Sequence, residues 1–286
     1  MQEIIQKAGV LLEALPYIQR FRSSIFVVKY GGSFMDSPDP KVRSGVASDI
    51  VFLEAVGINP VVVHGGGKAI TKAMEKAGIQ ARFVQGMRVT DGESMKIVED
   101  VLANVINRDI IEMIQKLGGK ARGFSGKEVF KCRKLLSGGV DLGYVGEVTG
   151  VTVEPVRKCL RASVTPVISP IGVGDDGHAY NINADVAAAK LAMAIGARRL
   201  VFMSDVPGLM HDPHKPETLI SHLEVNDVLN LKRDGIIDAG MIPKVDSAVE
   251  AVQSGVRRVH FVDGRIAHSI LLEIFTDKGI GTEIVK

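Results

Sequence analysis

The chain has 286 residues, of which 46% are hydrophobic and 24% charged, a composition typical of a globular protein with a sizeable buried core. A formal net charge of +2 is too small to favour a nucleic-acid partner, and no stretch reaches the roughly 18 apolar residues of a membrane span. The N-terminus lacks a secretory signal pattern, so we expect a cytoplasmic protein without nucleic-acid or membrane partners. Cys132 and Cys159 have neither C-x-x-C spacing nor a histidine cluster nearby, which disfavours disulfides and zinc and predicts buried free thiols.

The first predicted element is an amphipathic helix at residues 2–22. Its apolar side chains share one stripe, formed by Ile4, Ala8, Leu11, Leu12, Leu15 and Ile18. Pro16 is expected to kink this helix. Such a helix packs either on its own domain or on another subunit, and the pattern alone leaves both open.

Short β-branched runs then alternate with helical patterns. Strands are predicted at 25–33, 60–67, 165–172, 199–208 and 258–264, and helices at about 42–57, 68–77, 91–117, 184–196, 222–234 and 244–254. Thr90 and Glu93 match a capping box before the third helix, and the glycine-rich residues 123–163 predict hairpins near a sheet edge. The alternation indicates an α/β fold, an open αβα sandwich with a mainly parallel central sheet. Two lobes would share that sheet and divide near residue 195.

The stretch VVVHGGGKAIT at 61–71 runs from a strand directly into three glycines. It is no P-loop, because Ala69 follows Lys68, and no dinucleotide fingerprint, because Ile70 stands where the last glycine belongs. The HGGG oxyanion loop of esterases needs a G-x-S-x-G elbow, which this sequence lacks. Glycines at a helix start instead present backbone N–H groups to an anion.

A second glycine pair follows the first strand. Lys29 closes that strand and is followed by Gly31 and Gly32 in KYGGS, which places a cation beside bare backbone. A strand-end lysine alone would more often reach out to solvent. Because the construction recurs at 65–67, we predict two glycine cradles for two anionic groups.

Three further features stand at helix starts. Arg88 suits bidentate capture of a carboxylate, although an isolated arginine more often forms a surface salt bridge. Asn183 fits an N-cap and Asp185 a first-turn carboxylate, which leaves Asn181 without an explanation. Lys244 lies in a predicted first helical turn, where a cation opposes the helix dipole unless an anion binds there.

Together these features indicate phosphoryl transfer between anionic partners. That chemistry needs positioned cations rather than a nucleophilic side chain. A carboxylate acceptor is already ionised at neutral pH and requires no general base, which fits the absence of an obvious histidine base.

The motifs resemble those of the N-acetylglutamate kinases, in the amino-acid kinase superfamily. The resemblance spans the N-terminal helix to residue 286 and is carried by VVKYGGS, VVVHGGGKAI, GMRVTDGESMKIVEDVL, YNINADVAAAKLA, SDVPGLM and DAGMIPKVDSAVEAV. It implies ATP-dependent phosphorylation of the side-chain carboxylate of N-acetyl-L-glutamate, the second step of arginine synthesis. It also implies one kinase domain over 1–286, with an oligomerisation helix at 1–22, an acetylglutamate-binding lobe at 23–195 and an ATP-binding lobe at 196–286.

Site residues follow from the resemblance by position. Lys29 and Lys244 would stabilise the transferring phosphoryl group, and Asp185 would orient both lysines. The substrate would be held by Gly66, Gly67, Arg88 and Asn181. ATP would contact Lys29, Gly31, Gly32, Ser204, Asp205 and Lys244, with Mg²⁺ ligated mainly by phosphates and no metal site in the protein. Lys68 and Met87 depart from the usual Pro and His beside the substrate site, and residues 211–217 look longer than usual.

The N-terminal helix is similar to that of arginine-inhibited members, which are hexamers built as trimers of dimers. Members without it resemble insensitive dimers. Tyr17, His260, Glu273 and Gly279 match the arginine-binding forms, although His260 would equally fit a strand histidine with internal partners. We therefore expect L-arginine to be an inhibitor and the protein to be a homo-oligomer.

Two alternatives stay open: a kinase for a related acylated amino acid of the aminoadipate type, and a non-catalytic arginine sensor on the same fold. Lys29, Asp185 and Lys244 disfavour the sensor, because a sensor has no need of phosphoryl-transfer lysines. The missing dinucleotide fingerprint disfavours an oxidoreductase.

Overall fold

The computed structural model describes residues 2–32, 35, 39–137, 140–237 and 240–286. Ser33 of the first glycine motif lies outside these residues, and so do the side chains of Ile4, Ala8 and Leu11 in the N-terminal stripe.

A central eight-stranded sheet organises the molecule, in the order β12-β14-β13-β11-β1-β2-β8-β5. Its strands are β1 (Ile25–Tyr30), β2 (Asn59–His64), β5 (Ala121–Phe124), β8 (Thr165–Ile168), β11 (Arg199–Ser204), β12 (His222–Glu224), β13 (Arg258–Asp263) and β14 (Thr282–Val285). Among the described strands of this sheet, neighbours are parallel except for β13 and β14. The predicted mainly parallel sheet is confirmed.

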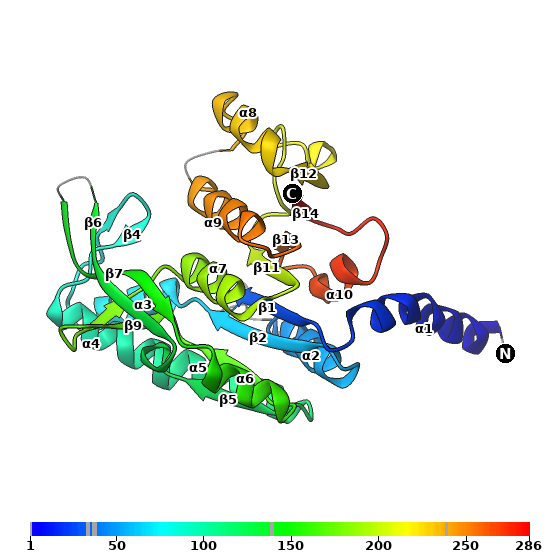
Figure 1. The fold of residues 1–286 in the computed structure, drawn as a ribbon, viewed down its shortest axis with the longest axis horizontal. Helices are drawn as coiled ribbons and strands as arrows, with labels where there is room; N and C mark the ends of the chain where they lie inside the picture. The colour runs from blue at the N-terminus through cyan, green and yellow to red at the C-terminus, as the bar shows by residue number, and fades with distance from the viewer. Residues whose placement is uncertain (1, 33–34, 36–38, 138–139, 238–239) are drawn as a thin grey trace.

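Helices cover both faces of the sheet (Figure 1). One face carries α2 (Pro40–Ala55), α3 (Gly67–Lys76), α4 (Gly92–Asp100), the π segment η2 (Val101–Ile106), α5 (Asn107–Lys116) and α10 (Ser269–Ile274). The other carries α6 (Glu154–Arg161), α7 (Ala184–Ile195), α8 (Val228–Arg233) and α9 (Ile242–Gln253). Side chains alternate along the central strand, so Val27 packs toward α7 while Phe26 and Val28 pack toward α2. This confirms the αβα sandwich.

A small barrel flanks the sheet. It is formed by β6 (Phe130–Ser137), β7 (Val140–Val151), β9 (Ile171–Gly174) and β10 (Ala179–Asn181). The antiparallel β6–β7 hairpin confirms the hairpin expected within 123–163, and α6 was not expected there. The single strand predicted at 165–172 is wrong, because the chain leaves the sheet at Ser169 and Pro170 and enters the barrel as β9. Both cysteines are buried free thiols, as predicted.

Two further predictions fail for reasons of long-range pairing. The helix expected at 222–234 begins only at Val228, because residues 222–224 pair with β14 as an edge strand and residues 225–227 form the short helix η5 (Val225–Asp227). Thr90 does not cap α4, since its backbone pairs with β7 through Leu142 and Tyr144. Asp91 takes the capping position, and its side chain accepts a hydrogen bond from the Ser94 amide at 2.8 Å.

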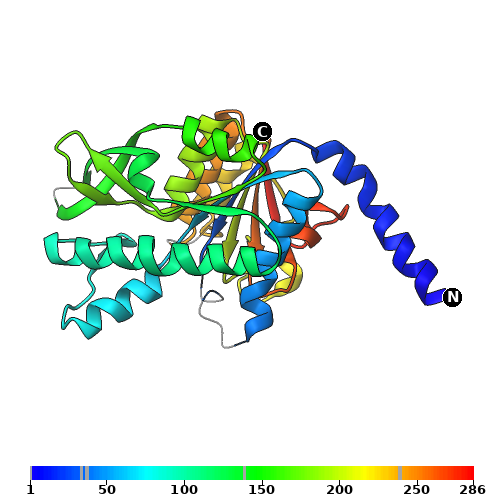
Figure 2. The ribbon, with the colours of Figure 1, turned by 90° about the horizontal axis from the view of Figure 1, so that it is seen from below.

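The N-terminal helix α1 (Gln2–Phe21) projects from the body of the molecule, as Figure 1 and Figure 2 show. Its C-terminal end is anchored by Phe21, which is buried. Leu12 is 66% exposed on the projecting part. The remaining short elements are the hairpin strands β3 (Phe83–Val84) and β4 (Met87–Arg88) and the 3₁₀ turns η3 (Gly126–Glu128) and η4 (Pro216–Thr218). In the described part of the chain, no helix has both the length and the apolar character to cross a membrane.

Candidate active site

The two predicted glycine cradles lie side by side. Strands β1 and β2 are parallel neighbours in which Tyr30 pairs with His64, so the glycines that follow them meet at the same sheet edge. A Cβ on Gly31 would stand 3.3 Å from the Gly65 amide nitrogen and 3.0 Å from Lys29 Nζ. This close approach leaves little room for a side chain at position 31 and brings the Lys29 ammonium beside the two glycine loops.

The second cradle opens a helix. Helix α3 begins at Gly67, and Gly66 occupies its N-cap without a side-chain cap. The first N–H groups of α3 are therefore available to an anion, which the helix dipole favours. A Cβ on Gly66 would approach Ile106 Cδ1 to 2.6 Å and Leu102 Cδ2 to 2.7 Å, so the π segment forms an apolar floor beneath the loop.

A charged triad lies beside the cradles. Lys29 Nζ is 3.0 Å from Asp185 Oδ1, and Lys244 Nζ is 3.6 Å from Asp185 Oδ2. Asp185 is only 6% exposed. Burial raises the pKa of its carboxyl, but the two lysines outweigh burial and hold that pKa below its usual range. The triad thus carries one net positive charge at neutral pH.

Local sequence places the triad. Asn183 caps α7, because its side chain accepts hydrogen bonds from the amides of Asp185 and Val186, as predicted. Lys244 lies in the first turn of α9, which also confirms the predicted helix start. Two helix N-termini and two lysines therefore converge on one point, and this field favours phosphate groups.

A cleft of about 960 Å³ joins these features. Its lining includes predicted residues from both cradles and from the triad's surroundings: Lys29, Gly31, Gly32, Gly66, Gly67, Arg88, Asn181, Asp185 and Asp205. Lys244 contacts the lining through Asp185, and the buried Ser204 ends β11 next to Asp205. Lys68 and Met87, the two departures from the family pattern, also line the cleft.

Arg88 is a buried cation with hydrogen-bond partners but no carboxylate partner among the described residues. The residue is 7% exposed, and its side chain donates hydrogen bonds of 2.8 Å to the Gly67 carbonyl and to Thr71 Oγ1. The guanidinium also lies 4.7 Å from the centre of the Phe83 ring. Burial lowers the pKa of Arg88, and no carboxylate among the described residues forms an ion pair with it. A buried arginine without a counter-charge favours an anionic ligand.

Asn181 is linked to Arg88 through Thr90. Its Nδ2 donates to Thr90 Oγ1 at 3.2 Å, and Thr90 Oγ1 donates to the Arg88 carbonyl at 2.8 Å. The amide is therefore held at the cleft wall beside Arg88 rather than at the cap of α7. A ligand bound by Arg88 would meet it.

The described residues of the cleft do not form a metal cage. In the part of the chain that the structure describes, no group of three or more His, Cys, Asp or Glu side chains is placed to hold a metal ion. Each Asp185 oxygen faces a lysine, which leaves that carboxylate poorly placed to bind Mg²⁺.

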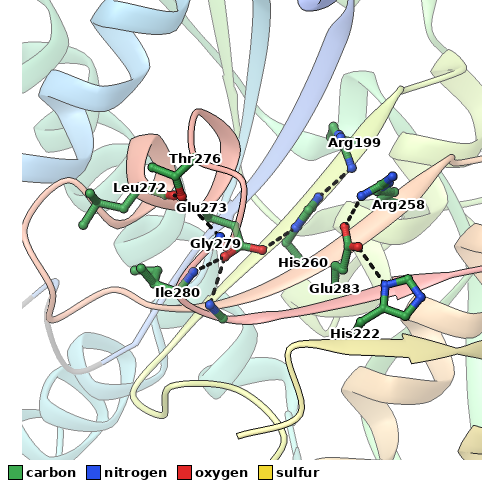
Figure 3. A network of polar contacts seen from close by, with 11 residues as sticks. Arg199, His222, Arg258, His260, Leu272, Glu273, Thr276, Gly279, Ile280 and Glu283 are labelled. Carbon is green, nitrogen blue, oxygen red and sulfur yellow. Dashed lines mark hydrogen bonds and ion pairs between the residues drawn. The ribbon is translucent and has the colours of Figure 1, made fainter. Parts of the chain in front are cut away.

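The four residues matched to arginine binding gather around α10, and Figure 3 shows the polar contacts of three of them, His260, Glu273 and Gly279. His260 Nδ1 lies 2.7 Å from Glu273 Oε1, while Glu273 Oε2 accepts from the amides of Ile280 and Gly281 at 2.7 and 2.9 Å. Arg199 lies 3.0 Å from His260 Nε2. Burial lowers the pKa of His260 although Glu273 opposes it. His260 thus has a partner on each ring nitrogen, the alternative that its sequence left open.

Tyr17 and Gly279 complete this cluster. The Tyr17 hydroxyl hydrogen-bonds the Asp277 carboxylate, and its ring meets Phe275 edge-on. Gly279 has φ +62°, and a Cβ there would lie 2.6 Å from Glu273 Oε2. The C-terminal part of α1 therefore contacts the segment that follows Glu273.

A family model described as the amino acid kinase family matches residues 24–263. Acetylglutamate kinase from Methanocaldococcus jannaschii is 48% identical over 297 residues, which cover 100% of this chain and 98% of the relative. Acetylglutamate kinase from Halothermothrix orenii is 46% identical over 290 residues, with 100% and 99% covered. The chain belongs to the acetylglutamate kinases of the amino acid kinase family.

A solved relative shares the fold. N-acetylglutamate synthase from Neisseria gonorrhoeae, complexed with coenzyme A and N-acetyl-glutamate, superposes with a TM-score of 0.86 at 25% identity. The match covers 98% of this chain and 63% of the synthase, so this chain spans less than two thirds of that protein. The same synthase complexed with coenzyme A and L-arginine gives a TM-score of 0.81.

Proposed function

We propose that this enzyme transfers the γ-phosphoryl group of ATP to the side-chain carboxylate of N-acetyl-L-glutamate, giving ADP and N-acetyl-L-glutamyl 5-phosphate. The observation that carries the proposal is the Lys29–Asp185–Lys244 triad beside two glycine cradles and the buried, unpaired Arg88. The names of the relatives support the choice of acceptor. Its place would be the second step of arginine synthesis, in the cytoplasm.

Each group then has a role in the transfer. One oxygen of the acceptor's side-chain carboxylate attacks the γ-phosphorus, while the bond from that phosphorus to the β–γ bridging oxygen breaks and ADP leaves with its electron pair. Lys29 and Lys244 stabilise the charge spread over the transferring group, and Asp185 holds both ammonium groups in place. No proton is removed, because the acceptor is already ionised.

The two substrates occupy opposite sides of Lys29. The acceptor lies on Gly66 and Gly67, with its other carboxylate and amide on Arg88 and Asn181. ATP lies toward Gly31 and Gly32, which follow β1, and toward Ser204 and Asp205 in the part formed by residues 196–286. It brings Mg²⁺ on its phosphates. The acceptor part is then formed by residues 23–195.

A panel of acceptors tests this proposal. In a coupled assay of ADP release, acetylglutamate is expected to give a kcat/KM at least about 10²-fold above glutamate, aspartate and N-acetylaminoadipate, because the cleft holds both ends of the acceptor. A preference for acetylaminoadipate would assign the related kinase. Absence of turnover with every acceptor would support the non-catalytic sensor instead.

We further propose that L-arginine inhibits the enzyme through the cluster around α10 and that α1 joins subunits into a hexamer, a trimer of dimers. Support comes from the tie between Tyr17 and Asp277, from the exposed Leu12 on the projecting helix, and from the arginine complex of the related synthase. Arginine would bind next to Glu273, whose Oε1 retains a lone pair beyond the one used by His260.

Arginine titration of the wild type and of a variant lacking residues 2–14 tests this regulation. The wild type is expected to lose activity as arginine rises and to have the mass of a hexamer by light scattering. The variant keeps Tyr17 and Phe21, so it is expected to fold, to form smaller assemblies and to need a higher arginine concentration. Equal insensitivity of both proteins contradicts the arginine proposal, and a wild-type dimer contradicts the hexamer.

A further inference from the structure

The second glycine cradle rests on a buried polar pair that the phosphoryl-transfer residues do not include. His64 is the last residue of β2 and is fully buried. Its Nδ1 lies 2.9 Å from the Gly65 carbonyl oxygen, and its Nε2 lies 3.2 Å from Asn107 Nδ2. Asn107 is also buried and donates to the Val167 carbonyl at 2.9 Å. The pair therefore links the cradle to β8 and to the start of α5.

The contacts determine which ring nitrogen carries the proton. The Val167 carbonyl only accepts, so the group of Asn107 that faces it is the NH₂. The same NH₂ faces His64 Nε2, which must accept and therefore carries no hydrogen. The single hydrogen of a neutral imidazole is then on Nδ1, where it is donated to the Gly65 carbonyl.

The imidazole stays neutral under working conditions. Burial lowers the pKa of His64 to about 4, against the hydrogen bond to Gly65, which raises it. His64 is thus a fixed hydrogen-bond donor at neutral pH and has no free position for a catalytic proton.

Holding the Gly65 carbonyl also orients the next amide. In a planar trans peptide, the C=O of one residue and the N–H of the next point in opposite directions, and the described chain has no cis peptide. With the Gly65 oxygen turned inward to His64, the Gly66 N–H points the other way. The cleft is lined by residues 65–67 but not by His64, so that direction is toward the cleft.

A glycine loop needs such a clamp. Gly65 and Gly66 have no side chains to restrict their backbone, so the peptide between them would rotate at little cost. Leu102 and Ile106 of the π segment limit the space under Gly66, but their apolar side chains cannot donate a hydrogen bond to the Gly65 carbonyl. The same π segment leads directly into Asn107, and such segments are frequent at functional sites.

We propose that His64, held by Asn107, is a positioning residue that fixes the Gly66 amide toward the oxygens of the acceptor and the transferring phosphoryl group. This inference rests on the proposed function. It makes the histidine of VVVHGGG part of the site without placing it in contact with a substrate.

Two conservative variants separate positioning from folding. In His64→Asn, the side-chain NH₂ occupies about the place of Nδ1 and retains the donor to Gly65. In His64→Gln, the amide reaches the place of Nε2, so it retains the contact with Asn107 and loses the donor. We expect His64→Gln to lower kcat at least about 10-fold and His64→Asn to stay within about threefold of wild type, as for loss of one oriented transition-state donor. The Kd for ADP is expected to be unchanged in both, because the donor side is built on other residues.

Equal losses of kcat in the two variants, scaling with their melting temperatures, would show a merely structural role and overturn the proposal. NMR of the wild-type protein tests the proposal even if both variants unfold. ¹⁵N and ¹³C NMR with residue-specific assignment of the seven histidines is expected to show His64 with hydrogen on Nδ1 and without titration between about pH 5.5 and 8. The assignment is needed because the contacts of His260 place its hydrogen on Nδ1 as well. A His64 imidazole with its hydrogen on Nε2 would refute the positioning proposal. Failure of acetylglutamate as acceptor would refute only the proposed function.

Discussion

Replacing Lys244 with alanine is expected to lower kcat by about 10²-fold or more, with much smaller changes in KM for both substrates. Lys244 lies 3.6 Å from Asp185 in the first turn of α9, where a cation opposes the helix dipole. Asp185 offsets part of that unfavourable placement but shares its charge with Lys29, so negative charge that develops on a transferring phosphoryl group would offset the rest. In the proposed mechanism, the ammonium therefore acts mainly on the transition state.

The fold of this variant is expected to survive. Asp185 keeps its 3.0 Å ion pair with Lys29, and removing a cation from the start of α9 costs that helix nothing. Lys190→Ala is the matched control, because Lys190 links α7 to α9 through Glu250 without lining the cleft. Initial-rate kinetics on both variants, with melting curves, check the prediction. Near-normal turnover without Lys244 would remove the triad from the mechanism.

Asp185→Asn is expected to lower both activity and stability. An amide leaves Lys29 and Lys244 close together without their shared counter-charge, and breaking a buried ion pair costs about 3–5 kcal/mol. We expect kcat to fall about 10³-fold, because both lysines lose their orientation. The melting temperature is expected to fall as well.

The effect of ATP on the melting temperature distinguishes loss of the shared counter-charge in Asp185→Asn from a general packing defect. Phosphates bring negative charge to the two lysines, so ATP with Mg²⁺ is expected to raise the melting temperature of Asp185→Asn more than that of the wild type. Asp246→Asn, on the exposed side of α9 and paired with Lys232, provides the control and is expected to behave like the wild type. An equal shift with ATP in all three proteins would contradict the proposed role of Asp185.

Much of the site was accessible from local patterns in the sequence. Lys29 and Asp185 stand at a strand end and in a helix first turn, and Lys244 was identified because it breaks the dipole rule in its own turn. These signals need only a few neighbouring residues. The grouping of the residues follows from parallel strands, whose carboxyl ends meet at one edge.

Other features depend on partners far away in the sequence. His64 and Asn107 are 43 residues apart, and each alone is compatible with an ordinary buried polar residue. Residues 222–224 have a helical pattern and become a strand only because β14 offers an edge. Thr90 does not act as the N-cap of α4, because its backbone pairs with Gly143 of β7, and a local capping pattern cannot predict such long-range pairing. Tertiary pairing overrides local preference in both cases.

The position of β1 in the sheet has a consequence for the reaction distance. In register, Lys29 has Val63 of β2 on one side and Phe202 of β11 on the other. The strand that ends at the acceptor glycines and the strand that ends at Ser204 are thus each one strand spacing, about 4.8 Å, from the strand of Lys29. Backbone hydrogen bonds fix that spacing, so under the proposed function the sheet sets the separation between the loops that would hold the two substrates.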